Sequence, residues 1–202
     1  MNLDTGCVDT HQPNNRIEAV GVGAVALVGM TIVPDGKDWT WVLSRVCPEC
    51  GFDTQSFSRG EIPAMIRANA AGWRAPLAAP DATDRPSPGR WSALEYGCHV
   101  RDVFRLYDYR LGLMLAEDDP LYPNWDQDET AVDDDYASQS PAVVADELAS
   151  AADAIADSFA GVSADQWLRP GRRSDGASFT VETFARYLMH DPVHHLHDVI
   201  GD

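Results

Sequence analysis

Lysine is nearly absent from this chain of 202 residues, which has one lysine, Lys37, and fourteen arginines against 32 aspartates and glutamates. The resulting net charge of −17 argues against nucleic acid and against an anionic membrane as partners. Such partners require a basic surface that displaces their counterions. The negative charge instead favours solubility.

Cysteine and long apolar runs are also scarce. Four cysteines at uneven spacing, two of them Cys47 and Cys50, are too few for the disulfide framework of a secreted protein, so we expect a reducing, cytoplasmic location. The apolar run at residues 20–30 is short for a membrane span. Acidic residues precede it, where a signal peptide would carry positive charge. We therefore expect neither a membrane anchor nor a secretion signal.

The two ends of the chain differ in character. Residues 1–29 are polar and then rich in glycine and alanine, without periodicity. We expect residues 1–37 to be an N-terminal extension, either a poorly ordered arm or an upstream start of the gene model. Residues 38–202 are expected to form one domain.

Apolar residues recur at helical spacing in four segments of the domain, at residues 60–77, 91–117, 142–160 and 180–199. Ser92 with Glu95 forms a capping box, Ser140 precedes a proline at the first helical position, and Thr180 caps the last segment. Strand alternation is not evident after residue 60. These features predict an all-α fold, a four-helix bundle with an irregular N-terminal arm and a long acidic crossover at residues 121–139.

The last predicted helix holds four of the six histidines. His190 and His194 lie one turn apart and could close on one metal ion. His195 points about 100° away from His194 and should face another helix or solvent. A third ligand must come from elsewhere, and His99 on the second helix is the better of the two remaining histidines. Pro192 should bend the helix beside this pair.

Cys47 and Cys50 form a Cys-Pro-Glu-Cys-Gly turn that allows several interpretations. It resembles one knuckle of a zinc ribbon but lacks the second cysteine pair. A redox pair would need a βαβ pattern around it, which is not present. A tight turn with two half-buried thiols and a second metal site that uses both thiols also remain open.

Three segments carry a resemblance to a known family: WSALEYGCHVRDVF, PNWDQDE and RPGRRSDGASFTVETFARYLMHDPVHHLHDV. They resemble the DinB-like family of metal-binding four-helix bundles, which is grouped with mycothiol-dependent maleylpyruvate isomerases and bacillithiol transferases. The resemblance covers about residues 38–199. It implies a divalent metal bound by one histidine of the second helix and an H-x-x-x-H of the fourth, which by position are His99, His190 and His194.

Three neutral histidines leave a divalent ion, with zinc or nickel preferred, open positions that can activate water or a thiol. We expect a thiol-dependent S-transferase or isomerase that uses a mycothiol-type thiol on a small electrophile. Asp102 and Asp198 are candidates for carboxylates that orient an imidazole. Candidates for contacts with the thiol or the substrate are Arg101, Trp125, Arg172 and Arg173.

Other interpretations stay open at the level of sequence. The bundle could be a non-catalytic metal-binding or sensing module, or its histidines could bind no metal. A metalloprotease variant is disfavoured, because Asp191 is shorter than the glutamate of H-E-x-x-H and Pro192 interrupts the helix. Exposed bundle faces suggest a homodimer.

Overall fold

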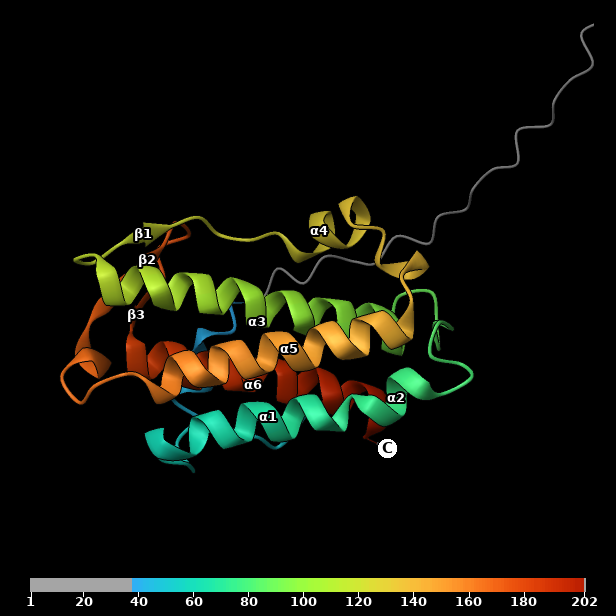
Figure 1. Cartoon of the computed structure of the whole chain (residues 1–202), viewed down its shortest axis with the longest axis horizontal. Helices are drawn as coiled ribbons and strands as arrows, with labels where there is room; N and C mark the ends of the chain where they lie inside the picture. The colour runs from blue at the N-terminus through green and yellow to red at the C-terminus, as the bar shows by residue number, and fades with distance from the viewer. Residues whose placement is uncertain (1–37, 202) are drawn as a thin grey trace, which may run out of the picture.

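The computed structural model describes residues 38–201, so the predictions for the extension at residues 1–37 lie outside the described residues. Four long rods make a bundle (Figure 1): α1 (Ile62–Gly72) continued by α2 (Arg74–Ala78), then α3 (Ala93–Ala116), α5 (Pro141–Ala160) and α6 (Val181–Ile200). Helices α1 and α3 each pack against both α5 and α6. The predicted all-α four-helix bundle is confirmed.

The helix starts follow the capping signals of the sequence. The Ser92 hydroxyl accepts a hydrogen bond from the Glu95 backbone N–H, and the Glu95 carboxylate accepts one from the Ser92 N–H at 2.9 Å. Thr180 and Thr183 make the same reciprocal pair at the start of α6. Buried apolar side chains from all four rods fill the interior, among them Ile66, Leu94, Phe104, Leu111, Leu148, Phe159, Phe184 and Leu188.

A small sheet at one end of the bundle was not predicted. It contains β1 (Leu121–Tyr122), β2 (Pro170–Arg173) and β3 (Ser178–Thr180), in the order β1-β2-β3. Strand β1 runs parallel to β2, and β2 runs antiparallel to β3. Strands of two to four residues are too short to show an alternating pattern, so they could not be predicted from the sequence.

The long connections are folded against the bundle. The crossover continues from β1 into α4 (Gln127–Asp133) and the 3₁₀ turn η3 (Tyr136–Ser138), and its Tyr122 and Tyr136 are buried. The segment before α1 contains η1 (Thr40–Leu43) and η2 (Arg59–Glu61), and η1 contacts α6. The last 3₁₀ turn is η4 (Gln166–Leu168). None of the helices within residues 38–201 is both long and apolar enough to cross a membrane.

Helix α6 continues through Pro192, although proline has no backbone N–H and cannot donate the hydrogen bond of a regular helical turn. At this level Asn69 of α1 donates from its side-chain nitrogen to the Pro192 carbonyl at 2.8 Å, and its oxygen accepts a bond of 3.3 Å from the Trp73 indole. Both bonds are buried. Asn69 therefore links α1 to α6 beside the histidines.

We predict that Asn69→Ala lowers the free energy of unfolding by about 1–3 kcal/mol, because the Pro192 carbonyl loses its side-chain donor and the buried Trp73 indole N–H loses its acceptor. Urea denaturation measures the change. As a control, Ser150→Ala removes a hydroxyl that bonds the Asp146 carbonyl on the exposed face of α5 and should stay within about 0.5 kcal/mol of wild type. Equal effects in the two variants would contradict the proposed role of Asn69.

Candidate metal centre and pocket

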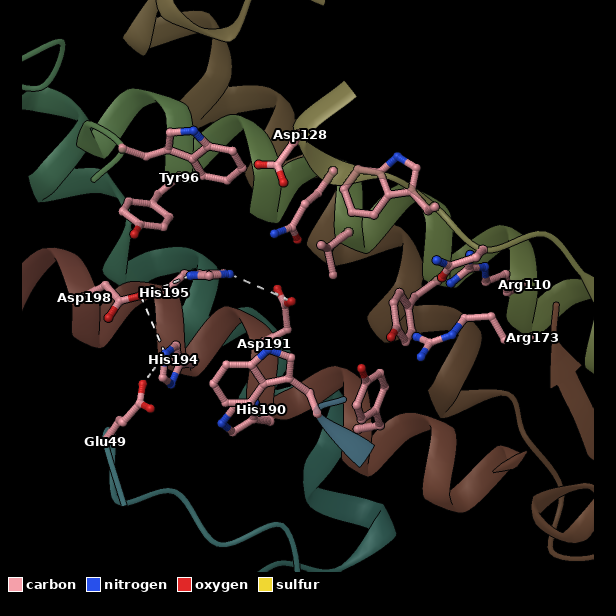
Figure 2. Close-up of a pocket in the computed structure, with 18 of the residues that line it drawn as sticks. Glu49, Tyr96, Arg110, Asp128, Arg173, His190, Asp191, His194, His195 and Asp198 are labelled. Atoms are coloured by element: carbon pink, nitrogen blue, oxygen red, sulfur yellow. Dashed lines mark hydrogen bonds and ion pairs between the residues drawn. The ribbon is translucent and has the colours of Figure 1, made fainter. Parts of the chain in front are cut away.

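A cavity of about 360 Å³ opens between α3, α6, the crossover and the segment before α1. Figure 2 shows Asp191 and His195 near its middle, with Arg110 and Arg173 together at one side. Its lining is rich in aromatic and charged side chains and includes Trp39, Glu49, Trp91, Tyr96, Tyr107, Arg110, Trp125, Arg173, Tyr187, Asp191, His195 and Asp198. A cavity of this size suits a small-molecule ligand.

Helix α6 presents two pairs of metal-ligating side chains, each spaced by four residues and offset from the other by one residue. Asp191 and His195 gather with His99 of α3, and one potential ligand atom from each lies within 4.8 Å of the others. His190 and His194 gather instead with Cys47 and Cys50. The structure thus does not bring together the expected set of His99, His190 and His194.

The physical reason for this grouping is the helix register. Neighbouring residues on an α-helix point about 100° apart, so a shift of one position moves the ligand pair to another face. The face that looks toward α3 carries Asp191 and His195, and His195 contacts His99 with ring centroids 4.8 Å apart. His195, which the sequence predicted to face another helix or solvent, thus faces α3, whereas Asp191 was not among the expected ligands.

The His99 cluster contains buried polar atoms that lack partners. His99 is 0% exposed, and neither of its ring nitrogens has a hydrogen-bond partner among the described residues. Its Nε2 lies 3.3 Å from Asp191 Oδ1, within ion-pair distance, but Asp191 Oδ1 also lacks a partner of hydrogen-bond geometry. Such groups are costly to bury, and a divalent cation would satisfy them. The donor set of two imidazoles and one carboxylate fits zinc, nickel or iron.

The charge state of Asp191 suits this role. Burial raises the pKa of Asp191, but the neighbouring His99 and His195 outweigh burial and lower the pKa to about 2. The Asp191 side chain is nevertheless 32% exposed, because it borders the cavity. Asp191 is therefore a carboxylate at neutral pH and remains accessible from the pocket.

The ring of His195 is oriented by a carboxylate. Its Nδ1 lies 3.2 Å from Asp198 Oδ2, and its Nε2 lies 3.9 Å from Asp191 Oδ2. An N–H at Nδ1 bonded to Asp198 leaves the lone pair of Nε2 directed at the cluster. Burial raises the pKa of Asp198, but its hydrogen bond with His195 and the adjacent histidine charges lower it below its ordinary value. Asp198, a predicted orienting carboxylate, therefore lies beside the His195 ring.

Aromatic rings hold the two imidazoles in place. Trp125 stacks on His99 with ring centroids 5.4 Å apart and planes at 11°, and Trp91 lies 5.6 Å from the same ring. Tyr96 lies 5.0 Å from the His195 ring. Trp125, expected to contact a thiol or substrate, thus lines the pocket and also packs on a candidate ligand.

Three other sequence candidates lie away from the cluster. Arg101 pairs with Asp102 and Glu147 at 2.9 Å, and Tyr136 donates its hydroxyl hydrogen to Asp102 at 2.7 Å. Among residues 38–201, Asp102 therefore contacts arginine and tyrosine side chains rather than an imidazole, and Arg101 ties α3 to α5 and the crossover. Arg172 is half exposed and pairs with Asp119 at 2.8 Å, outside the pocket.

Arg173, the remaining arginine candidate, lines the pocket and pairs with Asp175 at 2.8 Å. Arg110 of α3 lies beside it and was not among the candidates from the sequence. Arg110 is 3% exposed, donates to the Pro123 carbonyl at 2.7 Å and lies 4.9 Å from the centre of the Tyr122 ring. No carboxylate within residues 38–201 forms an ion pair with it. Burial lowers the pKa of Arg110.

A buried cation that has no carboxylate partner among the described residues is a candidate site for an anionic ligand. The sequence contained a signal for this residue, because Arg110 is eleven residues after His99. Eleven residues make about three turns, so both side chains lie on one face of α3, roughly 16 Å apart along the axis.

Comparison with known proteins identifies the family of this protein. The model of the DinB superfamily matches residues 65–199. This is more than half of the chain, and the protein belongs to the DinB superfamily. No curated protein matches it.

A solved structure supports the fold. The chain resembles YfiT from Bacillus subtilis, described as a probable metal-dependent hydrolase with an unusual four-helix bundle topology. The TM-score is 0.64 at 18% sequence identity, over 72% of this chain and 87% of that one. At this identity the likeness concerns the fold.

Two arginines of α3 should respond differently to replacement by methionine. Arg101→Met leaves the mostly buried Asp102 without its closest cation and should lower the free energy of unfolding by about 3 kcal/mol. Arg110→Met removes a buried charge that has no carboxylate partner and should stay within about 1 kcal/mol of wild type. Chemical denaturation measures both. A loss at Arg110 as large as that at Arg101 would assign Arg110 a structural role.

Proposed function

We propose that this protein is a metal-dependent enzyme that holds one divalent ion with His99, Asp191 and His195 and acts on a small anionic molecule. The observation that carries the proposal is the set of buried, unpartnered nitrogen and oxygen atoms of His99 and Asp191, gathered with His195 beside the cavity. Zinc and nickel are the preferred ions.

Three protein ligands leave coordination positions open, and an ion bound in this way supplies Lewis-acid activation of a nucleophile such as water or a thiol. The residues of the chain do the rest. Asp198 holds the proton on Nδ1 of His195 and so fixes the tautomer that can ligate. The aromatic rings of Trp125 and Trp91 limit solvent access to His99.

The substrate is proposed to carry a carboxylate or a similar anionic group. Arg110 and Arg173 lie together at one side of the pocket, with Asp191 and His195 nearer its middle. Tyr107 and Tyr187 also line this region. Burial raises the pKa of both tyrosines, so their hydroxyls stay protonated at neutral pH and can donate hydrogen bonds. Two guanidinium groups can bind a planar carboxylate through several N–H donors.

For the reaction we propose thiol-dependent transfer or isomerisation, in which a low-molecular-weight thiol such as mycothiol adds to an electrophile. Two observations support this choice: the family resemblance and the two arginines proposed to bind an anion. An unsaturated carboxylate would suit both, because it carries an electrophilic double bond and an anionic group. Metal-dependent hydrolysis is the second candidate, favoured by the fold shared with YfiT, itself described as a probable hydrolase. The cytoplasmic location and the homodimer expected from the sequence stay predictions.

The ligand set is tested by elemental analysis of untagged protein. We predict that His99→Ala and His195→Ala each lose one equivalent of divalent metal and about 100-fold or more in turnover, because two remaining ligands bind the ion weakly. His197→Ala is the matched control, an exposed histidine of the same helix, and should retain both metal and turnover. Full metal content in His99→Ala would contradict the assignment.

The substrate class is tested with a panel of α,β-unsaturated carboxylates, each paired with its neutral amide, in the presence of mycothiol, glutathione or water alone. We predict thiol adducts or isomers of the carboxylates, detected by mass spectrometry. Arg110→Met should reduce kcat/KM about 10-fold or more for the carboxylates and little for the amides, because it removes a charge-assisted contact.

Each other outcome has a definite meaning. Hydrolysed products without thiol adducts would favour the second candidate. Metal binding without turnover of any compound would favour the non-catalytic binding or sensing module. Equal losses for carboxylates and amides in Arg110→Met would contradict the anion-binding role of this arginine.

A further inference from the structure

The second cluster of ligating side chains begins in the turn at Cys47. The Cys47 N–H donates to the Phe52 carbonyl at 3.0 Å, and the Gly51 N–H donates to the Cys47 carbonyl at 2.9 Å. Gly51 has a φ of 71°, a left-handed conformation that glycine adopts without steric cost. The turn places both sulfurs on the side that faces α6.

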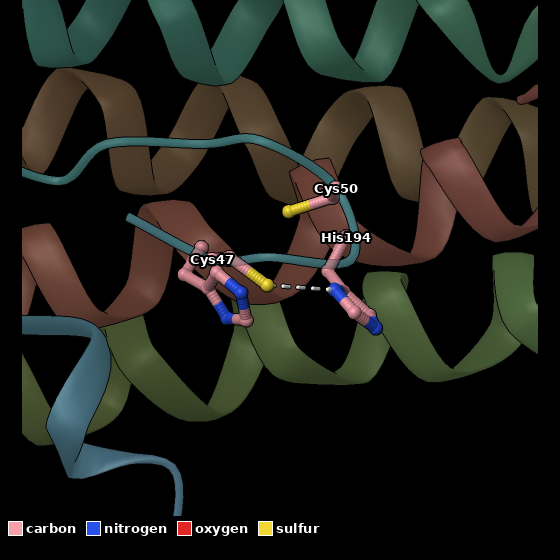
Figure 3. Close-up of side chains that lie close together, drawn as sticks. Cys47, Cys50 and His194 are labelled. Atoms are coloured by element: carbon pink, nitrogen blue, oxygen red, sulfur yellow. Dashed lines mark hydrogen bonds between the residues drawn. The ribbon is translucent and has the colours of Figure 1, made fainter. Parts of the chain in front are cut away.

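Helix α6 supplies two imidazoles opposite these thiols. His194 Nδ1 lies 3.8 Å from the Cys47 sulfur, and Figure 3 shows the Cys47 and Cys50 side chains beside the His194 ring. One potential ligand atom each from Cys47, Cys50, His190 and His194 lies within 4.8 Å of the other three. Cys47, His190 and His194 are buried, and His190 Nε2 has no hydrogen-bond partner among residues 38–201.

We propose that Cys47, Cys50, His190 and His194 bind a second metal ion, a structural Zn²⁺ in tetrahedral coordination. Two thiolates and two imidazoles from a short turn and a helix are the donor set of closed structural zinc sites. On binding, each thiol releases its proton to solvent as its sulfur coordinates zinc, and the oxidation state of the sulfurs does not change. This site is separate from the His99 cluster and does not depend on its chemistry.

The surroundings of His194 fit ligation through Nδ1. Its other ring nitrogen, Nε2, lies 3.5 Å from Glu49 Oε2 and 3.8 Å from Asp198 Oδ2. A carboxylate on the far nitrogen of a metal-bound imidazole orients the ring and increases its basicity. Asp198 also contacts His195, so one carboxylate orients a ligand of each metal.

A redox role for the two thiols is less consistent with their environment. Catalytic and redox cysteines have lowered pKa values and partly exposed sulfurs. Burial instead raises the pKa of Cys50 to about 11, although the Phe52 backbone N–H partly offsets this effect. Cys47 is fully buried. A pair in which Cys47 is buried and the pKa of Cys50 is raised is poorly suited to oxidation, but both thiols can give up their protons to a zinc ion.

The site would fasten the segment before α1 to α6. Trp39 packs on both imidazoles, with ring centroids 5.3 Å from His190 and 5.2 Å from His194. Trp39 and Glu49 also line the pocket. His190 and His194 line it as well, so the proposed zinc ion would hold one wall of the pocket in place.

Zinc K-edge X-ray absorption of untagged protein carrying His99→Ala tests the proposal, because this variant removes the other cluster. We expect one equivalent of zinc with two sulfur neighbours at about 2.3 Å and two nitrogen neighbours at roughly 2.0–2.1 Å. The double variant Cys47→Ser with Cys50→Ser, in the wild-type background, should lose one equivalent of zinc. Cys98→Ser is the matched control, a buried cysteine outside the cluster, and should lose none.

Limited proteolysis separates loss of the site from loss of the fold. In the double serine variant, cleavage within residues 38–61 should accelerate roughly 10-fold or more, while the far-UV circular dichroism of the bundle stays at the wild-type level. Zinc coordinated only by nitrogen and oxygen, absence of zinc in the His99→Ala protein, or full zinc content in the double variant would each overturn the proposal. So would a Cys47–Cys50 disulfide in protein purified without added oxidant.

Discussion

The site depends on the rotational orientation of α6 about its own axis. Four ligating side chains occupy two turns of this helix, in two pairs offset by one residue, and the 100° between neighbours sends each pair to a different partner. Asp191 and His195 meet α3, whereas His190 and His194 meet the turn at Cys47. A rotation of α6 by one residue would separate both pairs from their partners. The long apolar contact of α6 with α1 and α3 prevents such a rotation.

The two clusters differ in the number and kind of their potential ligands, and this difference suggests different roles. The His99 cluster offers three potential ligands and borders a cavity with two arginines, an arrangement typical of catalytic ions. The Cys47 cluster offers four potential ligands, two thiols and two imidazoles, and Trp39 packs on both imidazoles, a donor set typical of structural ions. Asp198 touches a histidine of each cluster. The same helix thus connects the chemistry of the pocket to the stability of its wall.

Much of the fold was predictable from residues alone. Capping residues such as Ser92 and Thr180 and the apolar periodicity located the long helices to within a few positions, because helix starts and faces are encoded locally. The strands escaped prediction, since segments such as β1 have too few residues to show a pattern. Arg110 was overlooked although its spacing from His99 was readable. Its significance arises from burial without a counter-charge, which only packing reveals.

Local sequence pattern was enough to predict a helical bundle with clustered histidines on its last helix and a thiol pair ahead of its first helix. Which of those side chains meet depends on how the helices pack. Periodicity shows that His190 shares a face with His194 and Asp191 with His195, but not which face turns toward α3. That choice is made by side-chain packing between helices distant in the chain. The same long-range packing brings Cys47 and Cys50 to His194, more than 140 residues later, a contact that no local pattern encodes.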